Sequence, residues 1–313
     1  MTAWSPATLP LRGRLKADAP LGPRSWFRTG GAADWLFVPA DTGDLATLMR
    51  ARPAEVPVTV LGACSNVIIR DGGVEGLVVR LAGGFADVTF DQDPETGQAA
   101  GVTVGAAMLD ASLAERAAEA GLGGLEFLVG IPGSIGGAVR MNAGAHGGEM
   151  ADVLDWVEVL LEDGRLERLK RAQLTMHYRH TALPENSIVV RARLAGRPEA
   201  PQEIQARLAA IRQTREITQP VRARTGGSTF RNPEGHSAWK LIDAAGCRGL
   251  RIGDAQVSEK HCNFLLNLGQ ATSAELERLG ETVRERVLAD SGVALHWEIK
   301  RLGRPSAPPT IPA

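Results

Sequence analysis

Apolar residues recur along this chain with the two spacings that are typical of helices and of strands. Four of them stand three or four positions apart, as on one face of a helix: Leu276, Leu279, Val283 and Val287. Thr272 and Glu275 precede this run as a capping box, which predicts where the helix begins. Residues 187–194 instead carry an apolar side chain at every even position, which predicts a half-buried strand.

The rest of the chain carries weaker signals of the same kinds. Asp41 can cap a helix, and a second helix is expected over 107–120, where Gly121 ends it. Asp163-Gly164 favours a two-residue hairpin turn between two strands. In a final strand, Glu298 falls on the face opposite the apolar residues. The expected strands are 35–38, 56–61, 77–81, 102–104, 156–161, 165–169, 187–194 and 293–301.

The length and the order of elements predict a mixed fold, α+β or α/β, with two or three packed units for 313 residues. The polar run 195–202, which includes two prolines, marks a domain boundary. A helix follows it, with Ile204, Leu208 and Ile211 on one stripe. The expected division is 1–20 as a lead-in, 21–84, 85–196 and 197–303 as folded parts, and 304–313 as a proline-rich disordered tail.

Composition and charge exclude several classes of protein. Apolar residues make up 44% and charged residues 23% of the chain, which is an ordinary globular balance. With 35 basic and 36 acidic residues, there is no net field to gather nucleic acid. The three cysteines are widely spaced, which argues against a disulfide framework and a zinc site. Because no stretch is apolar enough for a signal peptide or a membrane helix, we expect a cytoplasmic protein that binds no membrane.

Glycines concentrate in one segment of the chain. The residues from Gly121 to Gly148 include ten of the 36 glycines, where a proportional share would be about three. Backbone N–H groups in such turns can form a concave nest that binds phosphate without a lysine. The run Gly130-Ile-Pro-Gly-Ser-Ile-Gly-Gly137 fits this use, although it matches neither standard phosphate motif. It favours a bound dinucleotide cofactor, and a string of ordinary turns is the alternative.

Two smaller polar motifs each have two interpretations. Gly62, Ser65 and Asn66 follow a strand, where open sheets often place their ligands, but they can equally form a simple turn. Asn142 can cap a helix or bind a phosphate. The three glycine and polar segments together are stronger evidence for a cofactor than any one of them.

Local pattern alone gives the other polar residues no catalytic role. Ser228 is typical of a turn serine, and Arg179 is typical of a surface arginine. His177 and His180 are three positions apart, but no third ligand matches them, so no metal site is expected. A basic run is either a solvated face or a diphosphate site: Arg212, Arg215, Arg222 and Arg224.

Taken together, these segments resemble the MurB family, the UDP-N-acetylenolpyruvoylglucosamine reductases of bacterial cell-wall synthesis. The resemblance runs from about Arg28 to Gly303, and Glu298 stands where the family has its catalytic glutamate. In the first loop, Ala63-Cys64 replaces two glycines of the family pattern. The most specific segments are Thr29 to Gly31, Gly62 to Asn66, Gly130 to Gly137, Arg140 to Gly144, Tyr178-Arg179, Gly227-Ser228 and Gln256 to Lys260.

The resemblance implies FAD bound by a two-subdomain module of the PCMH-like flavin-oxidase type, made of residues 21–84 and 85–196. Residues 197–303 would form an α/β domain that holds the UDP-sugar, in the shorter, type II form of the family. NADPH would reduce the FAD and leave. The flavin N5 would then give a hydride to UDP-N-acetylglucosamine enolpyruvate, which yields UDP-N-acetylmuramate. We expect a monomer that acts only on small molecules.

The same resemblance assigns roles to single residues. Arg179 and a protonated Glu298 would donate hydrogen bonds to the substrate carboxylate as negative charge develops, and Ser228 would deliver the proton. The substrate-binding set is Tyr178, Arg215, Asn232 and Lys260. The FAD-binding set is Thr29, Gly30, Gly62, Ser65, Asn66, Gly130, Ile131, Pro132, Gly133, Ser134, Gly136, Gly137, Asn142, Ala143 and Gly144.

Other functions remain possible on the sequence. A flavin oxidase of the same fold, with oxygen as acceptor, would have no use for Arg179, Ser228 and Glu298 together. A flavin-free nucleotide-sugar binding protein or transferase would use the glycine loops for phosphate only and would be colourless. A structural role would leave the glycines and the polar loop residues without a common purpose.

Overall fold

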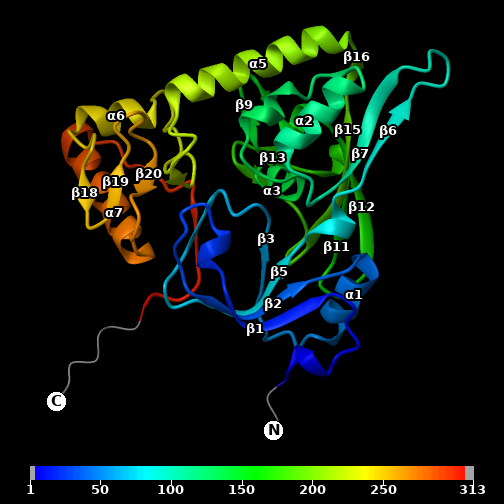
Figure 1. The fold of residues 1–313 in the computed structure, drawn as a ribbon, viewed down its shortest axis with the longest axis horizontal. Coiled ribbons are helices and arrows are strands. Elements are labelled where there is room, and N and C mark those ends of the chain that lie inside the picture. Colours follow the sequence, from blue (N-terminus) through cyan, green and yellow to red (C-terminus); the bar gives the residue numbers. More distant parts are fainter. Residues whose placement is uncertain (1–3, 307–313) are drawn as a thin grey trace. The chain divides into compact units, whose positions relative to one another are not determined.

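The computed structural model describes residues 4–306 (Figure 1). These residues form two compact units. The first unit comprises the described residues up to Lys16, Leu36–Ala63 and Val78–Arg215. The second comprises Ala17–Trp35, Cys64–Leu77 and the described residues from Glu216 onward. The division into three folded parts that the sequence suggests stays a prediction. The predicted disordered tail lies outside the described residues from position 307 on.

The first unit contains a five-stranded antiparallel sheet, in which the strands follow the order β12-β11-β15-β7-β6. The alternation predicted for 187–194 is confirmed, because the four apolar residues at even positions of β15 are each 4% exposed or less. Val157 and Val104 pair with Ala192 from either side and form the centre of the core. The strands are β6 (Val88–Gln92), β7 (Ala99–Gly105), β11 (Leu154–Leu160), β12 (Leu166–Lys170) and β15 (Ile188–Ala195).

Helices accompany this sheet in the first unit. Asp41 caps α1 as predicted, because its carboxylate accepts from the Asp44 N–H at 2.9 Å. Helix α3 packs against β15 and β7 (Figure 1). Helix α2 begins at Asp110, later than the expected residue 107, because the residues before it bond to another loop. The helices are α1 (Thr42–Ala51), α2 (Asp110–Glu119), α3 (Ile135–Arg140), α4 (Met150–Val153) and α5 (Pro201–Thr218), of which α5 passes into the second unit at Glu216.

A four-stranded sheet and three short strand pairs complete this part of the chain. The sheet has the order β1-β2-β5-β3, and the chain passes between the two units inside β1, β2 and β5. Its strands are β1 (Arg14–Pro20), β2 (Ala32–Val38), β3 (Val58–Leu61) and β5 (Val74–Arg80). The pairs are β8 (Leu122–Gly123) with β16 (Arg197–Pro198), β9 (Gly144–Ala145) with β10 (Gly148–Glu149), and β13 (Met176–His177) with β14 (His180–Thr181).

The second unit packs two helices, α6 (Ala238–Ala244) and α7 (Ser273–Ser291), with a sheet of order β17-β20-β19-β18. The predicted capping box of α7 is confirmed, because Thr272 and Glu275 bond to each other's backbone N–H groups. The four apolar residues of its stripe are at most 1% exposed. The strands of this sheet are β17 (Arg224–Thr225), β18 (Arg251–Ile252), β19 (Ala255–Val257) and β20 (Leu265–Asn267). The unit also contains the parallel pair β4 (Val67–Ile69) and β21 (Lys300–Leu302).

Two local predictions were wrong. The strand expected over 293–301 is reduced to β21, with one isolated bridge from Trp297 to Phe230, although the burial of residues 293–300 still alternates. The Asp163-Gly164 hairpin has a three-residue loop, since the Leu161 N–H bonds to the Arg165 carbonyl. A two-residue type I′ turn needs two positive φ angles, and only Gly164 has one there, at 77°.

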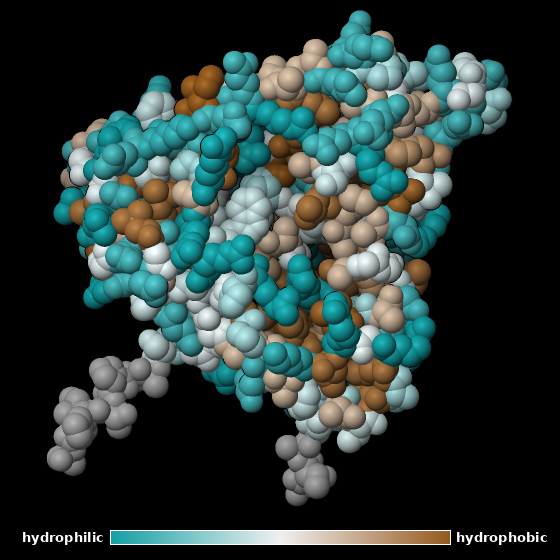
Figure 2. Space-filling view, viewed as in Figure 1, coloured by the Kyte–Doolittle hydropathy of each residue, from teal (hydrophilic) through white to brown (hydrophobic). Residues whose placement is uncertain are grey.

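Helix α5 has a narrow apolar stripe. Ile204 and Leu208 are buried, whereas Ile211 is only half-buried. On the face seen in Figure 2, hydrophilic side chains cover much of α5. None of the described helices combines the length and the apolar character that crossing a membrane requires.

Candidate active site

The glycine loop Gly130–Gly137 is fixed to the residues that precede α2. Three backbone hydrogen bonds of 2.9 to 3.2 Å join them: Ile135 to Met108, Gly136 to Ala106, and Asp110 to Gly133. Among the described residues, the N–H groups of Gly133 and Ser134 have no hydrogen-bond acceptor. Free backbone donors in a glycine-rich turn suit an anionic ligand such as a phosphate.

The structure brings the first glycine loop against the second. A Cβ atom on Gly62 would lie 2.5 Å from the Ser134 Oγ, which is closer than any real Cβ contact. A side chain at position 62 would therefore force the Ser134 hydroxyl to rotate away from its position. The two loops, 72 residues apart in sequence, form one cradle within the first unit.

A tight hairpin presents Arg179. The strands β13 and β14 pair His177 with His180, so that Tyr178 and Arg179 form the turn. Arg179 has a φ of 59°, in the left-handed region, and its guanidinium lies 4.7 Å from the centre of the Tyr178 ring. This conformation is uncommon for a residue other than glycine, so the paired strands must hold the turn in it.

Two buried polar side chains hold this hairpin. The Asn142 amide donates to the His177 carbonyl at 3.1 Å and accepts from the Ala151 N–H at 2.9 Å. The Thr181 hydroxyl donates to the Val139 carbonyl at 2.6 Å. Asn142 thus satisfies an N–H in the first turn of α4 and links that turn to the hairpin, and its predicted contact with FAD stays a prediction.

In the second unit, the segments that carry Ser228 and Glu298 lie side by side. The Glu298 N–H donates to the Thr229 carbonyl at 2.8 Å, and Phe230 forms a bridge with Trp297. The Thr229 N–H in turn donates to the Asn263 carbonyl at 2.7 Å. Ser228 and Glu298 are both half-buried, which suits side chains that meet a substrate.

Hydrogen bonds within the second unit hold two other predicted FAD residues, Thr29 and Asn66. Thr29 accepts a hydrogen bond from the Ser25 hydroxyl at 3.1 Å. The Asn66 amide donates to the Glu298 carbonyl at 3.3 Å. Cys64, which replaces a glycine of the family pattern, has a φ of 56° and is buried. It thus adopts the left-handed conformation that favours glycine.

The predicted substrate-binding residues have partners of their own. The Asn232 side chain accepts from the Ala238 N–H at 3.0 Å, at the start of α6. The Lys260 ammonium group donates to the Glu216 carbonyl. Arg215 donates to the Val129 carbonyl at 3.3 Å, and burial lowers the pKa of its guanidinium.

The predicted residues fall in both units. Gly62, Gly130–Gly137, Asn142–Gly144, Tyr178, Arg179 and Arg215 lie in the first, and Thr29, Gly30, Ser65, Asn66, Ser228, Asn232, Lys260 and Glu298 in the second. Each role stays a prediction. The described residues contain no group of three or more His, Cys, Asp or Glu side chains that could hold a metal ion.

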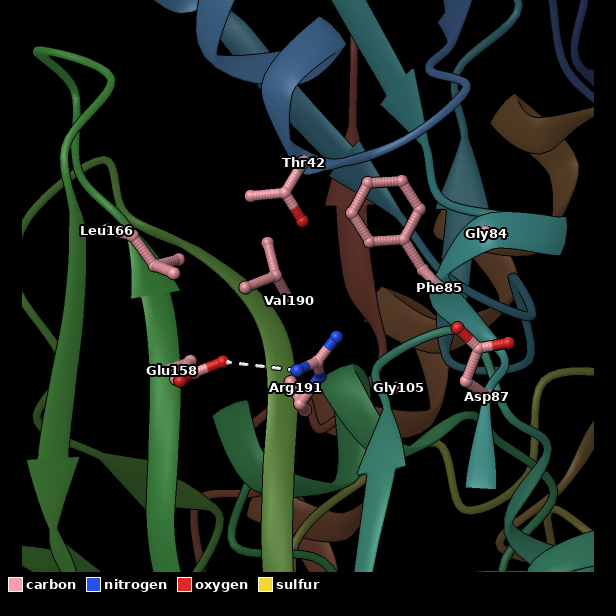
Figure 3. A pocket seen from close by; sticks show the side chains of 9 residues that line it. All are labelled: Thr42, Gly84, Phe85, Asp87, Gly105, Glu158, Leu166, Val190 and Arg191. Carbon is pink, nitrogen blue, oxygen red and sulfur yellow. Dashed lines mark ion pairs between the residues drawn. The ribbon is translucent and has the colours of Figure 1, made fainter. Parts of the chain in front are cut away.

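A separate pocket of the first unit contains none of the predicted residues (Figure 3). Glu158 of β11 and Arg191 of β15 point toward each other in it and form an ion pair at 4.0 Å. The other lining residues are Thr42, Gly84, Phe85, Asp87, Gly105, Leu166 and Val190. Its lining comes from strands β7, β11, β12 and β15 and from residues near α1 and β6, and it includes no residue of the glycine loops.

One unusual residue, Asp110, was not predicted from the sequence. Its side chain is fully buried, and neither carboxyl oxygen has a hydrogen-bond partner among the described residues. Burial alone raises the pKa of Asp110 well above its usual range. In the sequence it resembles an ordinary acidic residue in the first turn of a helix, so no local signal distinguishes it.

Comparisons with known proteins agree with this arrangement. Residues 33–170 match the model of the FAD binding domain, and residues 219–302 match that of the UDP-N-acetylenolpyruvoylglucosamine reductase C-terminal domain. The chain is 66% identical to the UDP-N-acetylenolpyruvoylglucosamine reductase of Gluconobacter oxydans, with 95% of this chain and 94% of that protein covered. The chain belongs to this reductase family.

Further relatives support the same assignment. The reductase of Acidiphilium cryptum is 59% identical, over 97% of this chain and 96% of that protein. The crystal structure of UDP-N-acetylenolpyruvylglucosamine reductase (MurB) from Thermus caldophilus superposes with a TM-score of 0.78 at 38% identity, covering 93% of this chain and 99% of that one. The predictions of the family, of the PCMH-like flavoprotein fold and of an FAD-dependent oxidoreductase are confirmed.

The residues present fit FAD. The cradle of Gly62 and Gly130–Gly137 offers close backbone approach, and the free N–H groups of Gly133 and Ser134 suit the pyrophosphate. Of the two fold classes expected, the antiparallel pairing of most strands is typical of α+β.

Proposed function

We propose that this chain reduces UDP-N-acetylglucosamine enolpyruvate to UDP-N-acetylmuramate with NADPH, as a step of peptidoglycan biosynthesis. Membership of the reductase family supports the reaction and the FAD. Within the site, the strongest support is the hydrogen bond from Glu298 to Thr229, which holds the Ser228 and Glu298 segments together. A cytoplasmic location and a monomeric state remain part of the proposal.

The glycine cradle would hold the cofactor. Gly133 and Ser134 would donate their free N–H groups to its phosphate oxygens, and Gly62 leaves room for close approach. When bound, FAD supplies the hydride chemistry between NADPH and the enolpyruvyl ether. The protein contributes binding and orientation.

Arg179 and Glu298 would stabilise the charge that develops on the substrate. Addition of hydride to the terminal vinyl carbon leaves an electron pair on the neighbouring carbon, which spreads into the carboxylate. Arg179 would bind that carboxylate with two parallel N–H donors, and its turn is fixed by Asn142 and Thr181. Glu298 in its protonated form would donate one more hydrogen bond.

Ser228 would complete the reduction. Its hydroxyl would give a proton to the carbon that bears the electron pair, and the serine alkoxide would regain a proton from solvent. A serine is a weak acid, but this carbanion is basic enough to take its proton. Gly227, with a φ of 74°, adopts the left-handed conformation that glycine takes without strain, and this turn would present the Ser228 hydroxyl to the substrate.

An anaerobic visible spectrum tests the whole proposal in one cuvette. The purified protein should show flavin absorption that bleaches with NADPH and returns when UDP-N-acetylglucosamine enolpyruvate is added. A parallel cuvette with NADH in place of NADPH measures the preference of the protein for the 2′-phosphate of NADPH. Bleaching without recovery on the sugar, or recovery with oxygen only, would contradict the proposed substrate and favour a flavin oxidase.

A further inference from the structure

The second unit carries an aromatic row that the proposed reaction does not yet use. Phe264 is buried, and its ring lies 4.8 Å, centre to centre, from the ring of His261. His261 in turn lies 6.2 Å from Trp239, whose side chain is 39% exposed. The row thus runs from the core of the unit to an indole ring on its surface.

The proposed substrate residues flank this row. Asn232 bonds to Ala238, the residue before Trp239 on α6, at 3.0 Å. Lys260 precedes His261 in the chain, and Lys240 places its ammonium group 5.7 Å from the centre of the Trp239 ring. An exposed aromatic ring with cations beside it is the combination that binds a base and its phosphates.

The row is held rigidly enough to serve as a platform. The Ser258 hydroxyl accepts from the N–H groups of both Lys260 and His261 at 3.2 Å. The His261 ring accepts from the Asn263 N–H at 3.3 Å through Nδ1. Burial, with a smaller effect of Arg248, lowers the pKa of His261, so that a neutral ring supports the indole.

We propose that Trp239 is the stacking surface for the uracil base of the UDP-sugar, with Lys240 and Lys260 beside the diphosphate. The inference rests on the proposed function, since it names how the same substrate is held. A pyrimidine needs a flat apolar ring on one side, and the exposed indole of Trp239 offers one. The residue would govern substrate affinity and leave the reduction of FAD by NADPH unaffected.

The test uses the FAD-loaded protein and the probe UDP, with binding measured by isothermal titration calorimetry. Trp239→Ala should weaken UDP binding about tenfold, and Trp239→Phe should keep most of the affinity. Inorganic pyrophosphate, which has no base, should bind equally to all three proteins. Trp156→Ala, which removes a tryptophan of the first unit that contacts Arg168, is the control and should bind UDP normally.

Steady-state kinetics separates stacking from a structural role. Trp239→Ala should raise KM for the UDP-sugar with little change in kcat, and the rate of flavin bleaching by NADPH should not change. UDP affinity equal to wild type in Trp239→Ala would overturn the stacking role alone. Equal losses for UDP and pyrophosphate would also overturn it. Failure of the wild-type protein to bind UDP would overturn the proposed function as well.

Discussion

The backbone N–H of Glu298 donates a 2.8 Å hydrogen bond to the carbonyl oxygen of Thr229, the residue that follows Ser228. The bond involves main-chain atoms only, so the side chains of Ser228 and Glu298 can be changed without breaking it. Asn263 reinforces the arrangement, because its side chain bonds to both the N–H and the carbonyl of Phe230. The proposed proton donor can therefore be tested separately from the fold around it.

Ser228→Ala should leave reduction of the flavin by NADPH intact and slow turnover of the enolpyruvyl sugar about 100- to 10,000-fold, the usual effect of losing a general acid. Anaerobic stopped-flow absorbance measures the two half-reactions separately. Ser237→Ala is a matched control, because Ser237 is a half-buried serine of the same unit whose side chain makes no capping hydrogen bond. Normal turnover by Ser228→Ala would eliminate the proton-donor role.

Thr181→Val should destabilise the hairpin that presents Arg179. The change removes the 2.6 Å hydrogen bond to the Val139 carbonyl, which keeps only its 3.2 Å bond from the Asn142 N–H, and this loss costs about 0.5–1.5 kcal/mol of unfolding free energy. Thr47→Val is the control, since the Thr47 hydroxyl also donates to a backbone carbonyl, but at an exposed position. Urea denaturation should show a clear loss for the first variant and a loss below about 0.5 kcal/mol for the second.

The activity of Thr181→Val tests whether the hairpin serves the substrate. If Arg179 binds the substrate carboxylate, a looser turn should lower kcat/KM for the sugar and leave flavin reduction by NADPH unchanged. A variant that loses stability but keeps full kcat/KM would show that the precise position of Arg179 does not matter to the reaction.

The sequence predicted elements well where short-range physics determines them. The capping box at Thr272 and the apolar stripe of α7 need only contacts within one helix and its core. The strand expected over 293–301 was wrong because alternation describes burial, whereas a strand also needs a neighbour to pair with. Between Trp297 and Lys300 the chain bonds to loop residues such as Thr229 and Asn66.

The candidate site shows the same contrast. Motifs predicted the glycine loops, but the contact of Gly62 with Ser134 depends on tertiary packing that no local pattern describes. Asn142 illustrates the limit further, because its amide holds a hairpin 35 residues away. Asp110 could not be found at all, since its lack of partners is a property of the folded chain.

Gly62→Ala should weaken FAD binding about tenfold, because the new methyl group overlaps the Ser134 hydroxyl and forces it to rotate out of its position in the cradle. Fluorescence quenching of FAD during titration of the apoprotein measures the dissociation constant. Gly83→Ala is the control, because nothing lies within 4 Å of the added Cβ and its φ is not positive. Adding Ser134→Ala to Gly62→Ala should recover part of the affinity, and wild-type affinity in Gly62→Ala would contradict the shared cradle.

Asp110 should make the apoprotein less stable as pH rises. Its pKa is raised in the folded state by burial, whereas in the unfolded chain it is about 3.9. The folded protein thus binds this proton more tightly, so the free energy of unfolding falls as pH increases from about 4 toward the raised pKa. Asp110→Asn cannot ionise and should not show this loss.

The measurement is the difference in unfolding free energy between wild type and Asp110→Asn, from urea denaturation of the apoproteins at several pH values above 4. The difference cancels the titration of the other groups, and it should shift in favour of Asp110→Asn with each step in pH. Asp93→Asn is the control, because hydrogen bonds from Thr96 lower the pKa of the exposed Asp93, so its contribution to stability is complete above about pH 4 and the difference for this variant should stay flat over the same range. A difference that stays constant with pH would mean that Asp110 has the same pKa folded and unfolded, and hence that it finds a partner when the protein is in solution.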